Sequence, residues 1–343
     1  MQKIFISLAV AFVFFGFACN TKKTEPGVAP FLQAQDAVLL NQLVYKINIE
    51  DSLKKYAPGY ELVFLPQPVN SNFAVIAKKK ETQQYALVIR GSLIEFSNEG
   101  FENFFLQDFN IFTMKAWEYT DTVANAYISN GAWIGFQNLL QLKDINSGLS
   151  LKEFIDQKID PKASLVITGH SLGGNLAYPL AGYLKKELTS GVRNNMNLVT
   201  FGAPAAGNAA FVQDLEEKFP DGERYVATND IAPVFPDINK IEEVAELIGL
   251  DSVLQINKLN LGGLEKQIKA KDILNIAGEI LEKTNIISPS SKYVQSSKHL
   301  RKLGNNEQMS SETPLSAEEL FNKAYQFHRV DTYARLLGGK PLD

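Results

Sequence analysis

Apolar side chains recur along the chain in two patterns. From residue 31 to 47 they follow helical spacing, which predicts an amphipathic helix at the start of the folded part. Elsewhere they form short, partly β-branched runs bounded by Gly, Pro and Asn, which predict strands. The predicted strands are residues 60–65, 73–77, 85–89, 165–168, 198–201 and 224–228, and further helices are predicted at 137–142, 149–156 and 175–184. Strands and helices therefore alternate over much of the chain.

One of these strands leads into a glycine-rich turn. Residues 165–168 are followed by Gly169-His170-Ser171-Leu172-Gly173, and a helical segment comes next. The order strand, sharp turn, helix is typical of a nucleophile elbow, in which a serine Oγ is exposed at the tip of a strained turn. Glycines on both sides let the strand and the helix approach closely. An ordinary glycine-rich loop is the alternative, but the flanking elements favour a catalytic Ser171, and the N–H of Leu172 would then point at a developing oxyanion.

A second turn offers the other half of an oxyanion hole. The predicted strand at 85–89 runs into Arg90-Gly91-Ser92. If this strand lies beside the elbow strand, the N–H and the hydroxyl of Ser92 are aimed where negative charge develops. Taken alone, this tripeptide is a common loop. Together with the downstream elbow it predicts an oxyanion hole formed by Ser92 and Leu172.

Composition and charge narrow the function classes. The chain has 343 residues, 45% of them hydrophobic and 21% charged, which is ordinary for a soluble globular protein with a sizeable core. The net charge of −4 leaves no basic stripe, so nucleic acid is not expected as a partner. The sequence gives no prediction of the oligomeric state.

The N-terminus differs from the rest of the chain. Lys3 precedes an apolar run from residue 4 to 18, which is too short to span a bilayer comfortably and is typical of a secretory signal. Cys19 is the one cysteine in the sequence and follows Gly16-Phe17-Ala18, which resembles the lipobox of bacterial lipoproteins apart from Gly16 in place of the usual leucine. A plain signal peptide with an incidental cysteine is the alternative. We expect a signal peptide at 1–19, a polar tether at 20–30, and a protein exported and lipid-anchored through Cys19 in a bacterial envelope membrane.

Three aspartates that follow Ser171 in the sequence are candidates for the carboxylate that orients a catalytic histidine. Asp230 comes at the carboxyl end of the predicted strand 224–228, before a rigid apolar turn. Asp214 lies on a probable helical segment, and Asp221 lies in a Pro-Asp-Gly turn, where turn chemistry explains an aspartate. We therefore expect Asp230 to orient the catalytic imidazole.

The sequence contains three histidines. His170 is next to the nucleophile and is expected to face away from its hydroxyl, which leaves His299 and His328. Both satisfy the order serine, acid, histidine. His299 stands in a basic stretch and is also explained as a surface residue.

Several of these motifs together resemble the ordered motif set of the class 3 lipases. The motifs are Arg90-Gly91-Ser92, Gly135-Phe136, the elbow at 169–174, Phe201-Gly202-Ala203-Pro204 with Gly207-Asn208, Asn229-Asp230, and His328 with Tyr333. The resemblance implies an α/β-hydrolase fold, with a mostly parallel central sheet flanked by helices, and a serine hydrolase acting on esters, commonly acylglycerols. It favours His328 as the base. One departure is Trp133, which stands where the family usually carries a histidine; plain core packing is the preferred interpretation, and a substrate contact is the alternative.

Two segments are candidate covers of the site. The aromatic segment 96–119 stands where the resembled family has its lid, although its rings are equally explained as core. A helical insertion at about 237–323, between the acid and the histidine, either caps the site or packs on its rim.

The sequence thus predicts one catalytic domain at residues 31–343. Ser171 is the nucleophile, His328 the base and Asp230 its partner, with an ester or lipid as substrate and no metal or organic cofactor. A thioesterase, peptidase or aryl esterase would share these residues. A non-catalytic binding protein on the same scaffold is the alternative from another class.

Overall fold

The computed structural model describes residues 28–92, 113–236, 255–256, 268–269, 293–304 and 325–342. The predicted signal peptide, most of the tether, residues 96–112 of the aromatic segment and most of the insertion at 237–323 lie outside the described residues. No helix of the described part combines the length and the apolar character needed to cross a membrane.

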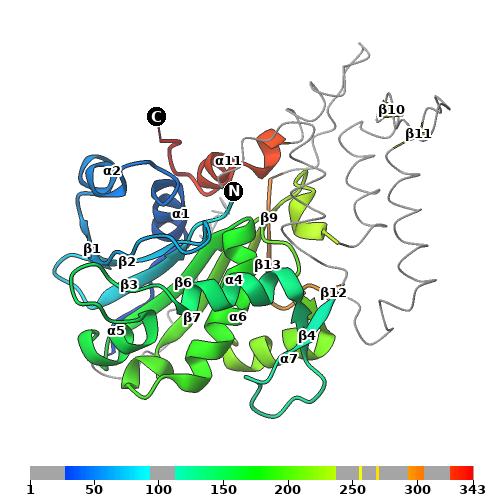
Figure 1. Cartoon of the computed structure of the whole chain (residues 1–343). Helices are drawn as coiled ribbons and strands as arrows, with labels where there is room; N and C mark the ends of the chain where they lie inside the picture. Colours follow the sequence, from blue (N-terminus) through cyan, green and yellow to red (C-terminus); the bar gives the residue numbers. More distant parts are fainter. Residues whose placement is uncertain are drawn as a thin grey trace, which may run out of the picture.

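A seven-stranded sheet forms the centre of the molecule (Figure 1). Its five parallel strands follow the order β3, β6, β7, β9, β13, and β2 and β1 extend the β3 edge antiparallel. The bounds are β1 Tyr60–Phe64, β2 Ala74–Lys79, β3 Gln84–Ile89, β6 Ser164–His170, β7 Met196–Phe201, β9 Glu223–Ala227 and β13 Leu300–Leu303. Parallel strands end at one edge, so the residues that follow β3, β6, β7 and β9 meet there.

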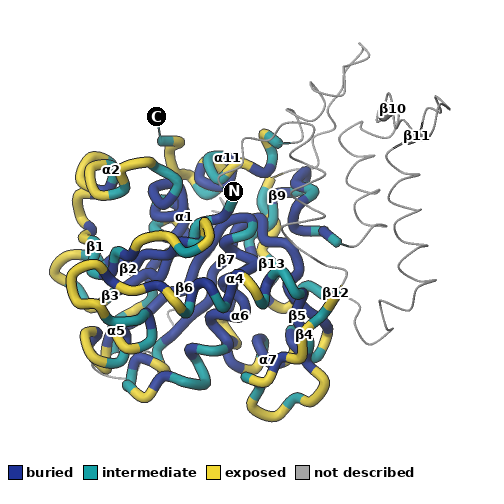
Figure 2. The backbone as a smooth tube through the Cα atoms, viewed as in Figure 1, coloured by how far each residue is buried: buried dark blue, intermediate teal, exposed yellow. Residues whose placement is uncertain are grey.

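Helices cover both faces of this sheet, as Figures 1 and 2 show. One core cluster joins a sheet face to α4, α5, α6 and α7, and a second joins the other face to α1, α2 and α11. Alternate residues of β6 belong to different clusters: Leu165 and Ile167 to the first, Val166 to the second. The helices are α1 Ala34–Leu43, α2 Ile49–Tyr56, α4 Asn130–Leu140, α5 Leu151–Lys158, α6 Leu172–Glu187, α7 Ala209–Lys218 and α11 Val330–Leu336. The observed layers are the α/β architecture that the sequence predicts.

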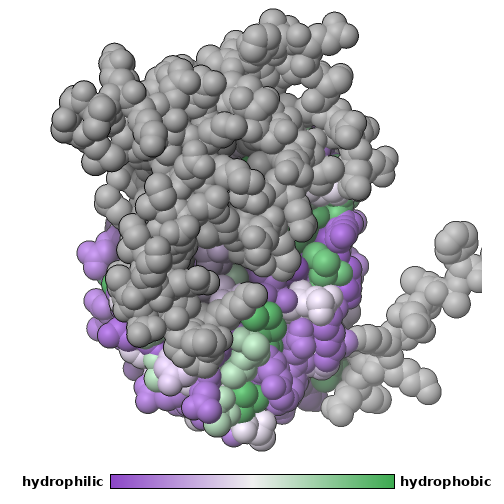
Figure 3. Space-filling view, turned by 90° about the vertical axis from the view of Figure 1, so that its right-hand side faces the viewer, coloured by the Kyte–Doolittle hydropathy of each residue, from purple (hydrophilic) through white to green (hydrophobic). Residues whose placement is uncertain are grey.

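Smaller elements lie around this centre. A second sheet has the order β12, β8, β5, β4, and β10 pairs with β11. The bounds are β4 Met114–Ala116, β5 Tyr127–Ser129, β8 Gly207–Asn208, β10 Gln255–Ile256, β11 Ile268–Lys269, β12 Tyr293–Val294, and the 3₁₀ turns η2 Gly191–Asn194 and η3 Ala232–Val234. Seen from the side in Figure 3, much of the described surface is hydrophilic, with separate hydrophobic residues between.

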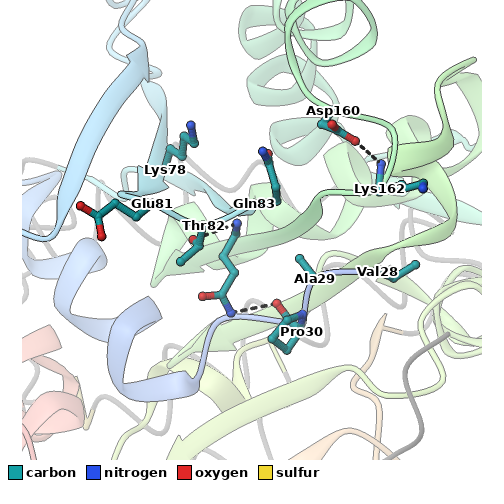
Figure 4. A pocket seen from close by; sticks show the side chains of 10 residues that line it. Val28, Ala29, Pro30, Lys78, Glu81, Thr82, Gln83, Asp160 and Lys162 are labelled. Atoms are coloured by element: carbon teal, nitrogen blue, oxygen red, sulfur yellow. Dashed lines mark hydrogen bonds between the residues drawn. The ribbon is translucent and has the colours of Figure 1, made fainter. Parts of the chain in front are cut away.

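The start of the described chain is fixed at the amino ends of the parallel strands (Figure 4). The N–H of Ala29 donates to the carbonyl of Lys162 at 3.3 Å. The carbonyl of Pro30 accepts from Ser164 Oγ at 2.7 Å and from Gln84 Nε2 at 2.9 Å. Since Ser164 begins β6 and Ser171 follows its last residue, the chain enters at the edge opposite the elbow.

Candidate active site

Ser171 occupies a strained turn between β6 and α6. Its φ of 59° and ψ of −130° are rare for a residue with a Cβ, and its N–H donates to the carbonyl of Phe201 at 3.0 Å. The side chain is nearly buried. This is the geometry of a nucleophile elbow, which presents the serine hydroxyl at the carboxyl edge of the sheet.

The glycines of the elbow are required by close backbone contacts. A Cβ on Gly169 would lie 2.2 Å from the carbonyl carbon of Gly173, and a Cβ on Gly173 would lie 2.2 Å from the carbonyl oxygen of Ile89. Strand, helix and the end of β3 therefore meet at distances that any larger residue would prevent. The sequence prediction that these glycines allow close approach agrees with this geometry.

His328 lies between the serine and the acid. Its Nε2 atom is 2.8 Å from Ser171 Oγ, and its Nδ1 atom is 2.9 Å from Asp230 Oδ2 and 3.1 Å from Oδ1. Because a carboxylate only accepts, Nδ1–H donates to Asp230 and the bare Nε2 accepts the Ser171 hydroxyl proton. The structure thus brings together the three residues that the sequence selects.

Three donors converge on the Asp230 carboxylate. Besides His328 Nδ1–H at its two oxygens, Oδ1 accepts the N–H of Ala232 at 2.9 Å and Oδ2 accepts the Tyr333 hydroxyl at 2.6 Å. The Tyr333 hydroxyl itself accepts the N–H of Ala227 at 3.1 Å. Burial, followed by the charge of Asp230, raises the pKa of Tyr333 well above its usual value, so the phenol keeps the proton that it donates.

The role of Tyr333 is one that sequence reasoning missed. The sequence marks it only as part of the C-terminal pattern, whereas its fully buried ring is the support of the catalytic acid. A tyrosine five residues after the candidate histidine is a usable signal, because a buried phenol needs a hydrogen-bond partner.

The loop after β7 also borders the acid. Gly202 has a φ of 56°, and a Cβ there would lie 2.9 Å from Asp230 Oδ2 and 3.0 Å from the Tyr333 hydroxyl. Asn175 of α6 donates to the carbonyl of Ala205 at 3.0 Å. The Phe-Gly-Ala-Pro motif thus connects the helix of the nucleophile to the turn of the acid.

The two predicted oxyanion residues lie on neighbouring backbone segments. A Cβ on Gly173 would be 2.8 Å from the N atom of Gly91, so the chain that leads into Ser92 runs directly against the first turn of α6, where Leu172 lies. The Ser92 hydroxyl is buried and has no hydrogen-bond partner among the described residues. A buried donor at this position suits an oxygen that gains negative charge during the reaction.

The competing candidates lie elsewhere. Asp214 pairs with Lys218 Nζ at 2.8 Å and accepts the N–H of Asp121 at 3.0 Å, which gives it a structural role. The interpretation of His299 as a surface residue is wrong: its side chain is 4% exposed, and a Cβ on Gly222 would lie 2.8 Å from its Cε1. Pairing of β13 with β9 turns this ring against the turn after α7, and burial lowers its pKa.

His170, the third histidine, has both ring nitrogens hydrogen-bonded away from the nucleophile. Nε2 lies 2.6 Å from the carbonyl oxygen of His328, and Nδ1 lies 3.2 Å from the Tyr45 hydroxyl. Burial, followed by the neighbouring His328, lowers the pKa of His170 well below its ordinary value. Its ring is therefore neutral near pH 7.

The described aromatic residues of α4 and of the segment 96–119 pack together. Trp133 of α4 is partly buried, with ring centroids 5.8 Å from Phe136 and 6.4 Å from Trp117. Core packing, the preferred interpretation for Trp133, agrees with these contacts. Trp117, from the aromatic segment, is 3% exposed and belongs to the same core, as does the partly buried Tyr119 packed against it. Within the described part of the chain, no group of three or more His, Cys, Asp or Glu side chains is arranged to hold a metal ion.

Residues 97–240 match the family model described as lipase (class 3). That segment contains Ser171 and Asp230 and ends before His328. Among solved structures, M37 lipase is similar at 22% identity and a TM-score of 0.65, with 90% of this chain and 93% of that chain covered. Lipase II from Rhizopus niveus is similar at 18% identity over 62% of this chain and 78% of that chain, with a TM-score of 0.46.

The likeness to M37 lipase shows a shared fold and confirms the predicted α/β-hydrolase architecture. The family match, added to this fold, confirms the predicted class of activity: the chain is a carboxylic ester hydrolase of the lipase type.

Proposed function

We propose that the chain is an acylglycerol lipase in which Ser171, His328 and Asp230 form the catalytic triad. The observation that carries the proposal is the continuous hydrogen-bonded path from Ser171 Oγ through the His328 ring to the Asp230 carboxylate, with distances of 2.8 and 2.9 Å. These distances allow proton transfer without rearrangement of the three side chains.

The first half-reaction forms an acyl-enzyme. His328 Nε2 takes the hydroxyl proton of Ser171 while Oγ attacks the ester carbonyl carbon. The negative charge that develops on the carbonyl oxygen is stabilised by the N–H groups of Ser92 and Leu172, and Asp230 stabilises the imidazolium. The imidazolium then returns its proton to the leaving alcohol as the carbon–oxygen bond breaks.

Water completes the cycle. His328 takes a proton from a water molecule, whose oxygen attacks the acyl carbon, and the same oxyanion donors act again. The proton passes to Ser171 Oγ as the acid is released. Besides the ester and water, these steps use side chains and backbone groups of this chain.

A series of p-nitrophenyl esters from acetyl to palmitoyl, together with an emulsified triacylglycerol, tests the proposal. The protein without residues 1–19 should cleave long-chain esters and the emulsion, and the Ser171→Ala variant should lose at least roughly a thousandfold in kcat. Faster cleavage of a matched thioester or an aryl acetate would favour another serine hydrolase. No turnover of any substrate would favour a binding protein.

We further propose that the protein is exported and held on a bacterial envelope membrane by acylated Cys19. The position of the one cysteine directly after the apolar run supports this, as does the polar stretch that follows it. The described chain begins at the amino ends of the strands, at the end of β6 opposite to Ser171, so the segment that leads from the proposed anchor joins the fold away from the triad.

A further inference from the structure

The ring of His170 joins two parts of the site that are far apart in sequence. Its side chain is 5% exposed, and its ring centroid lies 4.8 Å from that of His328 and 6.0 Å from that of Tyr45. Both of its nitrogens are in hydrogen-bonding range of a single polar group each. The contacts are 158 and 125 residues away in sequence, so they are features of the tertiary structure.

The chemistry of these partners fixes the tautomer of His170. The His328 carbonyl can only accept, so the 2.6 Å contact requires a proton on Nε2 of His170. A neutral ring then has a bare Nδ1, which can accept from the Tyr45 hydroxyl at 3.2 Å; the carbonyl oxygen of His170, at 3.3 Å, is the second acceptor within reach of the same hydroxyl. The Tyr45 hydroxyl in turn accepts the N–H of Gly91 at 3.1 Å.

One directed chain of hydrogen bonds results. It runs from Gly91 N–H to the Tyr45 hydroxyl, then to Nδ1 of His170, and from Nε2–H of the same ring to the carbonyl of His328. One end is the residue before Ser92, and the other is the main chain of the catalytic base. With His170 neutral, each link of this chain has one donor and one acceptor.

We propose that His170 is a positioning residue that, with Tyr45, sets the His328 backbone and the Ser92 segment relative to Ser171. This rests on the proposed function and goes beyond it. The His328 carbonyl belongs to the residue whose ring must meet both Ser171 Oγ and Asp230, so a shift of this peptide tilts the ring away from one of them. Such a loss acts on the chemical step and leaves substrate binding largely unchanged.

Two substitutions of His170 distinguish the role of its Nε2 atom from that of its Nδ1 atom. In His170→Gln the amide N–H₂ stands near the position of Nε2 and can still donate to the His328 carbonyl. In His170→Asn the side chain reaches only the position of Nδ1, so the carbonyl is left without a donor. We expect kcat on a soluble p-nitrophenyl ester to fall about 10- to 100-fold in the Asn variant and in His170→Leu, with KM within about twofold, and most of the loss to be recovered in the Gln variant.

Tyr45→Phe tests the other link. It keeps the ring but removes the acceptor of Gly91 N–H and the donor to His170, so we expect kcat to fall by about 3- to 30-fold. The double variant with His170→Leu should lose less than the product of the two single losses, because both act through one chain. Tyr178→Phe is the matched control for Tyr45→Phe, since its buried hydroxyl contacts Thr200 Oγ1 at 3.1 Å, away from this chain. His299→Leu is the matched control for the loss of a buried histidine.

The rate constants are measured on the purified full-length protein, and each is divided by the concentration of active sites titrated with a fluorophosphonate. This correction removes the effect of unfolded molecules. Asn and Leu variants with wild-type kcat per site, or a Gln variant no better than Leu, would overturn the inference. Wild-type protein that neither reacts with the fluorophosphonate nor cleaves esters would overturn the proposed function itself, and the inference with it.

Discussion

At the scale of single residues, the acid of the site depends on groups that contribute no chemistry of their own. Asp230 is buried, and its two oxygens accept from a histidine, a tyrosine and a backbone N–H. A buried carboxylate is stable only when such donors surround it. The same donors fix its orientation toward His328, so charge stabilisation and alignment have one structural cause.

Tyr333→Phe removes one of these donors. Asp230 Oδ2 loses a 2.6 Å hydrogen bond, and the N–H of Ala227 loses its acceptor. We expect the free energy of unfolding to fall by about 1–3 kcal/mol and kcat to fall by about tenfold. Urea unfolding and ester hydrolysis measure the two effects. Tyr178→Phe serves as the control; equal kcat in the Tyr333 variant and the wild type would show that the phenol does not align the acid.

The buried His170 makes the stability of the fold depend on pH. The pKa of His170 in the folded chain lies well below 6.5, whereas the unfolded chain has the ordinary value. Below pH 6.5 the unfolded state therefore takes up a proton that the folded state does not, and the free energy of unfolding falls by up to about 1.4 kcal/mol per pH unit for this residue. Above pH 6.5 the contribution of His170 to the free energy of unfolding is fully retained.

Urea unfolding at pH 7 and pH 5 tests this. In His170→Gln the decrease between the two values should be smaller by up to about 2 kcal/mol, because one proton-binding site of the unfolded chain is gone. The lowered pKa values of Asp144 and Asp156 act below about pH 4, outside this window. An identical pH dependence in both proteins would contradict a buried neutral His170.

At the scale of elements, strands were predicted more closely than helices. The predicted strand at 198–201 corresponds to β7, and that at 85–89 to β3, because apolar runs bounded by turn residues carry local information. The helix predicted at 137–142 begins at residue 130 instead, since the Ser129 side chain caps it by accepting the N–H of Ala132.

The residues of the candidate site also differ in how well the sequence predicts them. Motifs and their order were enough to select Ser171, Asp230 and His328. The residues that hold these side chains in place, Tyr45 and Tyr333, could not be selected in this way. Tyr45 lies just beyond α1 and reaches His170 only because that helix packs against β6. Such contacts depend on tertiary packing, and no local pattern encodes them. The buried state of His299 has the same origin, since it follows from the pairing of β13 with β9.

Two glycines of α6 give a matched comparison. A Cβ on Gly173 would lie 2.2 Å from the Ile89 carbonyl oxygen, so Gly173→Ala should separate the elbow from the oxyanion segment, lower stability by at least about 2 kcal/mol and remove most activity. A Cβ on Gly182 would meet nothing closer than Leu215 Cδ2 at 3.5 Å. Gly182→Ala should therefore gain about 0.5–1 kcal/mol from helix propensity at full activity.

Thermal unfolding and ester hydrolysis of both glycine variants measure this difference. Equal behaviour of the two would show that the close approach at Gly173 is not required. Loss of activity in the Gly182 variant would contradict the space for a methyl group at that position.

At the scale of the whole molecule, the first described residues and the edge that carries Ser171 are at opposite ends of the sheet. Pro30 is held at the start of β6 and Ser171 follows its end, with seven strand residues between them, or roughly 23 Å. Acylation of Cys19 should therefore leave the chemistry unaffected.

Cys19→Ser tests the anchor. In a bacterial host it should abolish incorporation of labelled palmitate and move the protein from the membrane to the soluble fraction, while kcat on a short soluble ester stays within about twofold. Unchanged labelling of the variant, or wild-type protein found free of the membrane, would contradict a lipid anchor at this residue.

The central claim is that the Ser171 hydroxyl is activated by His328. The most direct measurement is reaction of the purified protein with a fluorophosphonate, followed by mass spectrometry of its peptides. We expect one modified residue per molecule, Ser171, with loss of esterase activity in step with labelling and labelling at least about a hundredfold slower in His328→Ala. Modification of another serine, or esterase activity that persists after Ser171 is fully labelled, would contradict it.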